Sequence, residues 1–404
     1  MRIERSRSRL SFRKRRRRSG GCFSILFSVV LLGGVGAVSW LWINRLITPT
    51  NNSNAGLMAS AQNAFDRGDL SGAITLTRQI LVDQPDDITA LRLLVRSLVY
   101  RSYSDYNRTS DQTTALDATT EAIRRQPTNP DLLAIHAFAL QAAGRVDDAA
   151  DAAQRALENQ PNYTLARTAL ALAYGGAGAL EAALRESQRA VQSATAADNA
   201  IDALRALAIT YSDTGSYDDA ARTVERAIAL NGNLVTLYFE RAQYALLVGD
   251  SDAATVAYFE VLTHDENNVK ARLRLCELSS LMRERDQAVQ YCQEVTQRAP
   301  SWSEGWYRLG MEHFLQGNFD EAQSDLHRCS TLQVLQNVPI SERRFECWYI
   351  QGQAAEIRGD CDSLIATYNE FRAMNADAQI QQRWTYPPEG PPGCSTPLRT
   401  PTLQ

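Results

Sequence analysis

Glu312 and His313 stand side by side, and a carboxylate next to an imidazole could transfer protons or bind zinc. A zinc-protease HExxH motif needs a second histidine four residues after the first, and Gly317 occupies that place. A different metal site would combine His313 with His327 and Cys329 on the following segment. We expect His313 to be a packed ring instead, because the repeat described below places it in a slot that tyrosines hold elsewhere.

The remaining chemical candidates are glycines and paired carboxylates. The stretch YGGAGALEAAL, from Tyr174 onward, follows no strand pattern and lacks the Lys-Ser/Thr pair of a phosphate-binding loop. Carboxylate pairs such as Asp147 with Asp148, and Asp218 with Asp219, fall at expected helix starts, where they interact favourably with the helix dipole. We therefore expect no catalytic residue, no cofactor and no metal, in a chain that is not an enzyme.

A repeated spacing organises the segments that carry these residues. Single glycines separate apolar-periodic segments at intervals of 34, 37, 34, 68 and 42 residues: Gly144, Gly178, Gly215, Gly249, Gly317 and Gly359. The interval of 68 contains two units, with Arg283 at the missing turn, and Ser110 and Gly68 continue the series upstream. The spacing predicts nine units between residues 54 and 377.

Each unit repeats the same small residues around its turn. Five residues after the turn, every unit but the last has an alanine: Ala73, Ala115, Ala149, Ala183, Ala220, Ala254, Ala288 and Ala322. Seven residues before the turn, most units again have a small residue: Ala61, Ala137, Ala171, Ala208, Ala242, Cys276, Gly310 and Gly352. Small residues at these offsets predict hairpins of two closely packed helices.

This pattern resembles the tetratricopeptide repeat, a helix–turn–helix unit of about 34 residues. The most complete copy holds the family's signature residues Trp306, Leu309, Gly310, Gly317, Phe319 and Ala322. The resemblance implies an all-α fold, a right-handed α-solenoid of about nine repeats over residues 54–377. It also implies a concave groove, lined by the first helix of each unit, that binds extended or helical peptides.

The groove positions left free by the small and core slots are largely apolar and aromatic. Family members that hold a terminal carboxylate use lysines and asparagines there, whereas Lys270 is the only lysine of this array. The resemblance thus implies an apolar or amphipathic segment of another protein as ligand, unless several of these side chains belong to the core. The candidate partner-binding residues are Phe138, Leu172, Arg205, Ile209, Phe239, Gln243, Leu273, Glu277, Tyr307, Met311, Phe314 and Tyr349.

The N-terminal segments predict a membrane anchor. Residues 1–21 form a basic arm with nine arginines and one lysine against a single acidic residue. Residues 22–45 contain 22 consecutive uncharged residues, and a helix of that length spans about 33 Å, enough for a hydrocarbon core of about 30 Å. The basic arm should stay in the cytoplasm and the repeat array should lie outside it. A cleaved signal peptide is the alternative.

Cysteine use fits export from the cytoplasm. Six of the seven cysteines lie in the C-terminal third, and an even number suits disulfides of an oxidising compartment. The alternative is that they are small buried hydrophobic residues. By register and elimination, the predicted pairs are Cys276 with Cys292, Cys329 with Cys347, and Cys361 with Cys394.

Two short segments flank the predicted array, a polar linker at residues 46–53 and a Pro-rich tail at residues 378–404, which is flexible unless Cys394 pins it to the body. Beyond Arg45 the chain holds 31 basic and 45 acidic residues, so we expect no nucleic-acid partner. Only two lysines against 40 arginines favour a bacterial source. The features together predict a membrane-anchored, non-enzymatic scaffold that binds proteins or peptides in envelope assembly or secretion. A substrate-recruiting subunit of an enzyme complex, or a cleaved secreted protein, is the alternative.

Overall fold

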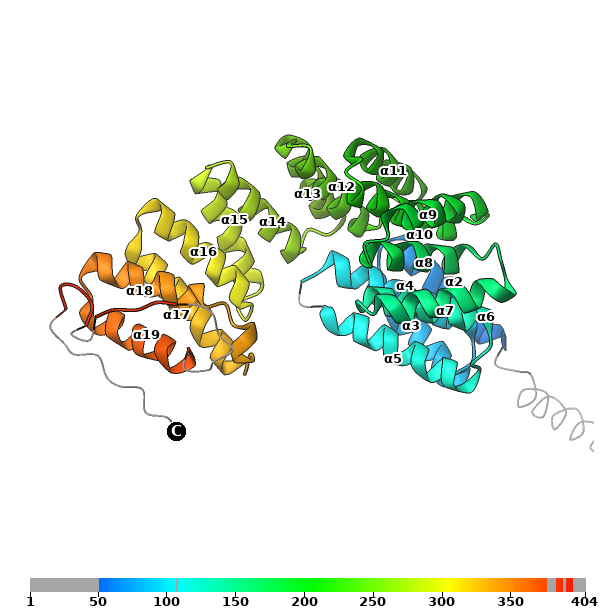
Figure 1. Cartoon of the computed structure of the whole chain (residues 1–404), viewed down its shortest axis with the longest axis horizontal. Coiled ribbons are helices and arrows are strands. Elements are labelled where there is room, and N and C mark those ends of the chain that lie inside the picture. Colours follow the sequence, from blue (N-terminus) through cyan, green and yellow to red (C-terminus); the bar gives the residue numbers. More distant parts are fainter. Residues whose placement is uncertain (1–50, 107, 376–382, 388–389, 395–404) are drawn as a thin grey trace, which may run out of the picture. The chain divides into compact units, whose positions relative to one another are not determined.

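The computed structural model describes residues 51–106, 108–375, 383–387 and 390–394. The chain divides into two units at Gly56, and all helices except the start of the first belong to the larger unit, which begins at Leu57. Over the described ranges the chain forms eighteen α-helices, one short 3-10 helix and no strand, which confirms the predicted all-α solenoid (Figure 1).

The helices form nine consecutive hairpins, and the 3-10 helix η1 (Ile340–Glu342) precedes the last of them. The hairpins are α2 (Asn51–Asp66) with α3 (Leu70–Asp83), α4 (Ile88–Ser104) with α5 (Thr109–Arg125), α6 (Pro130–Ala142) with α7 (Val146–Asn159), α8 (Thr164–Gly176) with α9 (Leu180–Ser193), α10 (Ala197–Asp213) with α11 (Tyr217–Leu230), α12 (Val235–Leu247) with α13 (Ser251–His264), α14 (Val269–Leu281) with α15 (Arg285–Arg298), α16 (Ser303–Gln316) with α17 (Phe319–Leu335), and α18 (Glu346–Arg358) with α19 (Cys361–Met374).

Most hairpins turn on a residue in the left-handed backbone conformation. The turn glycines have φ between 72° and 83°: Gly68, Gly144, Gly178, Gly215, Gly249, Gly317 and Gly359. Arg283, with φ 65°, stands at the turn of the seventh hairpin, where glycine would be unstrained. The second hairpin differs from the predicted register, because Ser110 lies inside α5 and not at a turn.

Small residues form the contact seam inside each hairpin. The eight alanines predicted five residues after the turns are all fully buried. At Gly310 an added Cβ would come within 2.7 Å of Leu326 Cγ on the paired helix, so this seam leaves no room for a side chain.

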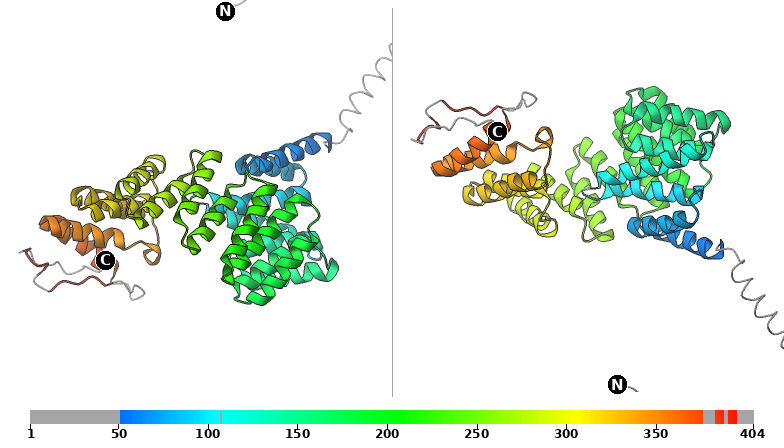
Figure 2. Two further views of the ribbon diagram at one scale, coloured as in Figure 1. Left: turned by 90° about the horizontal axis from the view of Figure 1, so that it is seen from above. Right: turned by 90° about the horizontal axis from the view of Figure 1, so that it is seen from below.

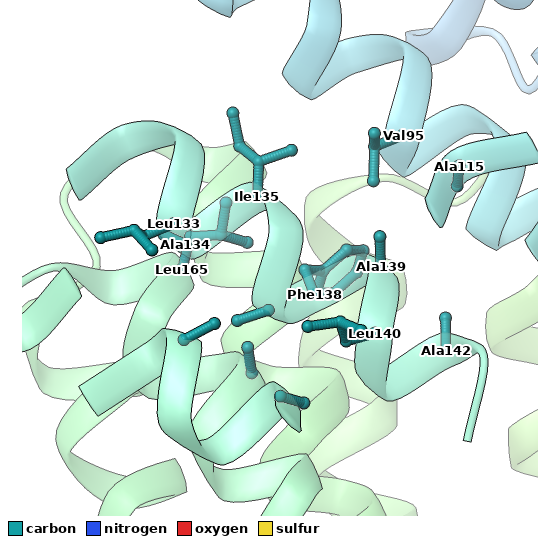
Figure 3. Close-up of a cluster of buried hydrophobic side chains, with 14 of the residues drawn as sticks. Val95, Ala115, Leu133, Ala134, Ile135, Phe138, Ala139, Leu140, Ala142 and Leu165 are labelled. Carbon is teal, nitrogen blue, oxygen red and sulfur yellow. The ribbon is translucent and has the colours of Figure 1, made fainter. Parts of the chain in front are cut away.

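A hydrophobic core runs through the second, third and fourth hairpins. Leu133, Ile135 and Phe138 of α6 belong to one buried cluster with Val95 of α4 and Leu165 of α8 (Figure 3). Removing each large aliphatic or aromatic side chain from water contributes about 1.5–3 kcal/mol. Packing between successive hairpins is therefore the main source of stability in this part.

The first two hairpins also pack against helices much farther along the chain. Phe65 of α2 and Leu93 of α4 share a buried cluster with Ile201 of α10 and Leu237 of α12. In Figure 2 the first hairpin, in blue, lies beside these green helices. Repeat units usually contact only their sequence neighbours, whereas here distant hairpins also pack together.

The described part of the predicted tail packs against the ninth hairpin, and Cys394, which would pin the tail to the body, is in a disulfide with Cys361. The ring of Trp384 lies 4.9 Å from that of Tyr368 and 5.4 Å from that of Phe371, centroid to centroid. It covers Gly352, where an added Cβ would overlap the indole. Among the described residues no further hairpin covers the apolar face of the ninth, and Trp384 packs there instead.

The N-terminal boundaries are only partly described. α2 begins at Asn51, inside the predicted linker of residues 46–53. The predicted basic arm, residues 1–21, and the predicted membrane segment, residues 22–45, lie outside the described residues. Among the helices that are described, none is both long and apolar enough to cross a membrane.

Candidate functional site

The inner face of the array holds a cavity of about 880 Å³. The first helices of the third to seventh hairpins line it, and the end of α4 adds a further wall. A volume of this size is typical of ligand-binding sites. Its lining residues with charged, aromatic or large apolar side chains include Tyr103, Leu172, Arg205, Ile209, Asp213, Phe239, Glu240, Tyr244, Lys270, Arg274 and Glu277.

The C-terminal end of α4 is held by side chains of distant hairpins. The last carbonyl groups of a helix have no partner within the helix and must find one elsewhere. Thr236 Oγ1 donates to the carbonyl of Tyr100 at 3.0 Å, and Asn268 Nδ2 donates to that of Ser104 at 3.0 Å. The sixth and seventh hairpins therefore cap a helix that lies more than 130 residues earlier in the chain.

A buried polar cluster joins α4 to α10. Arg96 Nε lies 2.8 Å from Asp202 Oδ2, and the Tyr100 hydroxyl donates to Asp202 Oδ1 at 2.8 Å. Burial and the neighbouring Asp202 raise the pKa of the Tyr100 phenol, so it remains a donor at neutral pH. This cluster fixes the end of α4 at the wall of the cavity.

Lys270 belongs to the same wall. Its ammonium group donates to the carbonyl of Tyr103, where a positive charge also interacts favourably with the end of the α4 dipole. It lies 4.8 Å from the ring centroid of Phe239. Burial, together with the nearby Arg274, lowers the pKa of the Lys270 ammonium to about 8. The only lysine of the array is therefore a helix cap, and its surroundings differ from those of a carboxylate clamp.

Two residues that line the cavity each have a buried polar atom without a hydrogen-bond partner among the described residues. Arg205 lies over the ring of Tyr103, 4.6 Å from its centroid, and donates to Glu240 Oε1. The second carboxylate oxygen, Glu240 Oε2, and the hydroxyl of Tyr244 remain unsatisfied within the described part of the chain. Burial raises the pKa of Glu240, an effect that the charge of Arg205 opposes. Unsatisfied buried groups are uncommon and call for a ligand or water.

The predicted groove residues divide into three groups. Six line the cavity: Leu172, Arg205, Ile209, Phe239, Gln243 and Glu277. Two are core residues and need correction, because α4 and its following loop cover them: Phe138 packs in the cluster that contains Val95, and Leu273 in the cluster that contains Tyr106 and Trp302. Four lie farther along, on α16 and α18: Tyr307, Met311, Phe314 and Tyr349.

Besides its apolar side chains, this inner face carries paired charges. Glu277 pairs with Arg274 at 2.6 Å and with Arg308 at 2.8 Å. Glu304 pairs in turn with Arg308 and Arg344, each at 2.8 Å. Arg308 and Arg344 thus form ion pairs between successive hairpins, and Arg344 covers the ring of Tyr307, 4.4 Å from its centroid.

The residues first considered for catalysis have structural partners. His313 Nδ1 lies 2.7 Å from Asp325 Oδ2 on the paired helix, and both side chains are largely buried. Glu312 accepts hydrogen bonds from Ser280 and Arg285 of the preceding hairpin. Within the described residues, no group of three or more His, Cys, Asp or Glu side chains could hold a metal ion.

Six cysteines form three disulfides, in the pairs that the register predicts. Their Cα atoms are 5.3, 5.9 and 5.6 Å apart, within the normal range for disulfides. All three lie between α14 and the C-terminal segment: Cys276–Cys292, Cys329–Cys347 and Cys361–Cys394.

Sequence reasoning missed several residues of the cavity. Asp213, Glu240 and Tyr244 lie on first helices at positions next to the predicted ones, so a wider window of groove positions would have found them. Tyr103 could not be found this way, because α4 reaches the cavity only through packing between distant hairpins.

Two family models match parts of the chain, and both are described as tetratricopeptide repeat. One matches residues 205–268, in the fifth and sixth hairpins, and the other matches residues 303–333, in the eighth. No curated protein sequence matches this chain.

The fold is similar to several solved structures. A crystal structure of the APC/C hetero-tetramer Cut9–Hcn1 matches with a TM-score of 0.54 at 13% identity, over 77% of this chain and 57% of that chain. The C-terminal part of a TPR repeat-containing protein from Cytophaga hutchinsonii matches with a TM-score of 0.49 at 11% identity, over 61% and 96%. A tetratricopeptide repeat protein from Parabacteroides merdae matches with a TM-score of 0.40 at 17% identity, over 65% and 99%. This chain thus spans little more than half of the first structure's length, and at such identity the likeness concerns the fold.

Proposed function

We propose that this chain of tetratricopeptide repeats is a membrane-anchored, non-enzymatic scaffold that binds a segment of another protein in its inner cavity. The observation that carries the proposal is the pair of buried, unsatisfied atoms at the cavity, Glu240 Oε2 and the Tyr244 hydroxyl, found in the described part of the chain. A peptide unit offers a donor N–H for the carboxylate and an acceptor C=O for the phenol. An extended segment therefore matches both atoms at once.

The charges of the cavity favour an uncharged ligand group over an ion. Three cationic side chains of the lining stand against three carboxylates, so the formal charges cancel: Arg205, Lys270 and Arg274 against Asp213, Glu240 and Glu277. Apolar walls from Leu172, Ile209 and Phe239 add room for aliphatic or aromatic side chains. The proposed ligand is an extended peptide with apolar side chains and no net charge at its centre.

The proposed location is outside the cytoplasm, at the membrane, with a role in envelope assembly or secretion. Support for anchoring comes from the sequence alone, through the uncharged segment within residues 22–45 and the basic arm that precedes it. Support for export comes from the three disulfides, since such bonds persist in oxidising compartments. An intact-mass measurement would distinguish an anchored chain from one cleaved after the apolar segment.

Site-specific photo-crosslinking in the protein's own cells tests the binding site. A photoreactive amino acid at Gln243, which lines the cavity, should capture a defined protein, and the crosslinked peptide should be identified by mass spectrometry. The control position is Arg185, an exposed residue of α9 outside the cavity lining. We expect capture at Gln243 and none at Arg185.

Two substitutions then test the unsatisfied atoms. Glu240→Gln and Tyr244→Phe should each weaken binding of the captured segment, because one changes the acceptor and the other removes the hydroxyl. A loss of about five- to tenfold in affinity corresponds to one hydrogen bond of about 1–1.5 kcal/mol. Equal capture at both crosslinking positions, or unchanged affinity of both variants, would reject the cavity as the binding site.

A further inference from the structure

The first helices of the last four hairpins share an exposed aliphatic residue two positions before the turn. The side chains are 43%, 74%, 50% and 56% exposed, in chain order Leu247, Leu281, Leu315 and Ile357. At the same register position, four of the first five hairpins have Asp66, Ala142, Gly176 and Asp213. The four aliphatic residues, called the turn-edge stripe below, therefore belong to one end of the array.

Three residues of the turn-edge stripe lie on first helices that pack against one another. α14 packs directly against α16, and α16 packs against α18. Leu246 of α12, the neighbour of Leu247, and Leu281 of α14 line the same cavity. Equivalent positions on adjacent, packed helices form a row along one edge. Exposed leucines at unrelated positions would be scattered over the surface and would form no such row.

Acidic residues follow the turn-edge stripe in every one of its hairpins. The second helix of each hairpin starts within a few residues of the turn with carboxylates: Asp250, Asp252, Glu284, Asp286, Asp320, Glu321, Asp360 and Asp362. Arg358 already pairs with Asp320 and Asp360, whereas Asp252, Glu321 and Asp362 have no ion pair within the described residues. The edge is therefore apolar in its centre and acidic along its side.

We propose that the turn-edge stripe docks an amphipathic helix of a partner protein that carries basic residues beside its apolar face. Packed helices lie about 8–10 Å apart, and a helix rises about 10.5 Å in seven residues. An apolar residue in every heptad of a helix laid along the edge would therefore meet one stripe residue per hairpin. Lysine or arginine beside that face would meet the carboxylates, whereas an anionic membrane surface would be repelled.

The turn-edge stripe extends past the proposed peptide site of the cavity. Leu315 and Ile357 do not line the cavity, so variants at these positions leave the groove residues intact. Loss of one binding activity is therefore distinguishable from loss of the other.

The test uses the full-length chain in neutral detergent and a synthetic helical peptide of four heptads, with leucines on one face and lysines elsewhere. A second peptide has glutamate in place of each lysine. Binding is measured by fluorescence anisotropy against a detergent-only blank, and a photo-crosslinker on the peptide reports the site by mass spectrometry. We expect the lysine peptide to bind about tenfold or more tightly than the glutamate peptide, and to crosslink to α16 and α18.

Matched variants identify the surface. Leu315→Asn with Ile357→Asn should weaken binding of the lysine peptide about tenfold or more, because the variant loses two apolar contacts with the leucines of the peptide. The control replaces two exposed apolar residues elsewhere, Val82→Asn with Leu335→Asn, which are 80% and 69% exposed, and should bind normally. Asp252→Asn with Asp362→Asn tests the charge separately and should weaken binding about threefold without touching the apolar face.

Three outcomes would overturn the proposal. The stripe variants could bind the lysine peptide as the control does, or both peptides could bind equally. In the third outcome the lysine peptide fails to bind, and the chain instead self-associates in sedimentation velocity or binds anionic vesicles. Either property would then be abolished by Leu315→Asn with Ile357→Asn. The occupant would then be a second copy of the chain or a membrane.

Discussion

The first six hairpins and the last three are built from the same pairs of helices but are held by different interactions. In the first six, the end of α4 reaches α10 and α12 through the buried contact of Arg96 with Asp202 and the hydrogen bond from Thr236 to Tyr100. In the last three, every cysteine is in a disulfide and the aromatic segment at Trp384 covers the final helices.

This difference shows two ways to stabilise the ends of a repeat array. Each hairpin buries its apolar face only against its neighbours, so the first and last units need an additional partner. At the N-terminal end that partner is another part of the array, which also forms a wall of the cavity. At the C-terminal end it is a short extended segment tied by Cys361–Cys394.

Of the changes considered, removing the Asp202 carboxylate should lower the free energy of unfolding most. Asp202→Ala takes the carboxylate from a buried guanidinium, so we expect the free energy of unfolding to fall by about 3–5 kcal/mol. Urea denaturation followed by circular dichroism measures the change. The control is Asp151→Ala, which removes an exposed pair with Arg155 at 3.7 Å and should cost about 0–1 kcal/mol. Equal effects of the two variants would show that the contact between α4 and α10 does not stabilise the array.

Reducing the disulfides should destabilise only the last three hairpins. A disulfide typically contributes about 2–4 kcal/mol, mainly by restricting the unfolded chain. After reduction and alkylation we expect faster amide hydrogen exchange in α16 to α19. The amides of α4 to α12 serve as the internal control, because residues 51–275 contain no cysteine. Faster exchange throughout the array would mean that the two regions unfold as one cooperative unit.

Titrating Lys270 tests the environment at the end of α4. The chain has two lysines, so Lys14→Arg leaves one signal for NMR of ¹³Cε-labelled lysine, and we expect a midpoint near the lowered pKa of about 8. The folded chain then loses this proton before the unfolded chain does. Lys270 should therefore make the free energy of unfolding rise with pH between about 8 and 10.4. A midpoint at the ordinary lysine value would place Lys270 in solvent and contradict its role as a cap.

Exchanging turn residues should give the smallest effects. Arg283→Gly removes a side chain from the left-handed conformation and should raise the free energy of unfolding by about 0.5–1 kcal/mol. Gly215→Ala should lower it by about 1 kcal/mol. An added Cβ at Gly215 meets no atom within 4 Å, so this variant isolates the backbone term. A decrease for Arg283→Gly would mean that the arginine side chain contributes more than its strained backbone costs.

The sequence predicted those features that depend on contacts within a hairpin or between neighbours. The alanine seams, the turn at Arg283 and the cysteine pairs follow from one spacing, because a residue's place in the repeat determines its neighbour. Half of the predicted groove residues line the cavity, because their place in the repeat also puts them on the inner face.

Only the tertiary structure decided which of those positions remain accessible and what charges surround them. Phe138 and Leu273 have groove positions by register but are covered by α4 and the residues that follow it. Lys270 looks like a free cation in the sequence but caps a helix that ends more than 160 residues earlier. Contacts of this kind arise from the superhelical path of the whole array. Periodicity in the sequence specifies local pairs of helices, and it carries no signal for hairpins that meet only after the chain has turned back on itself.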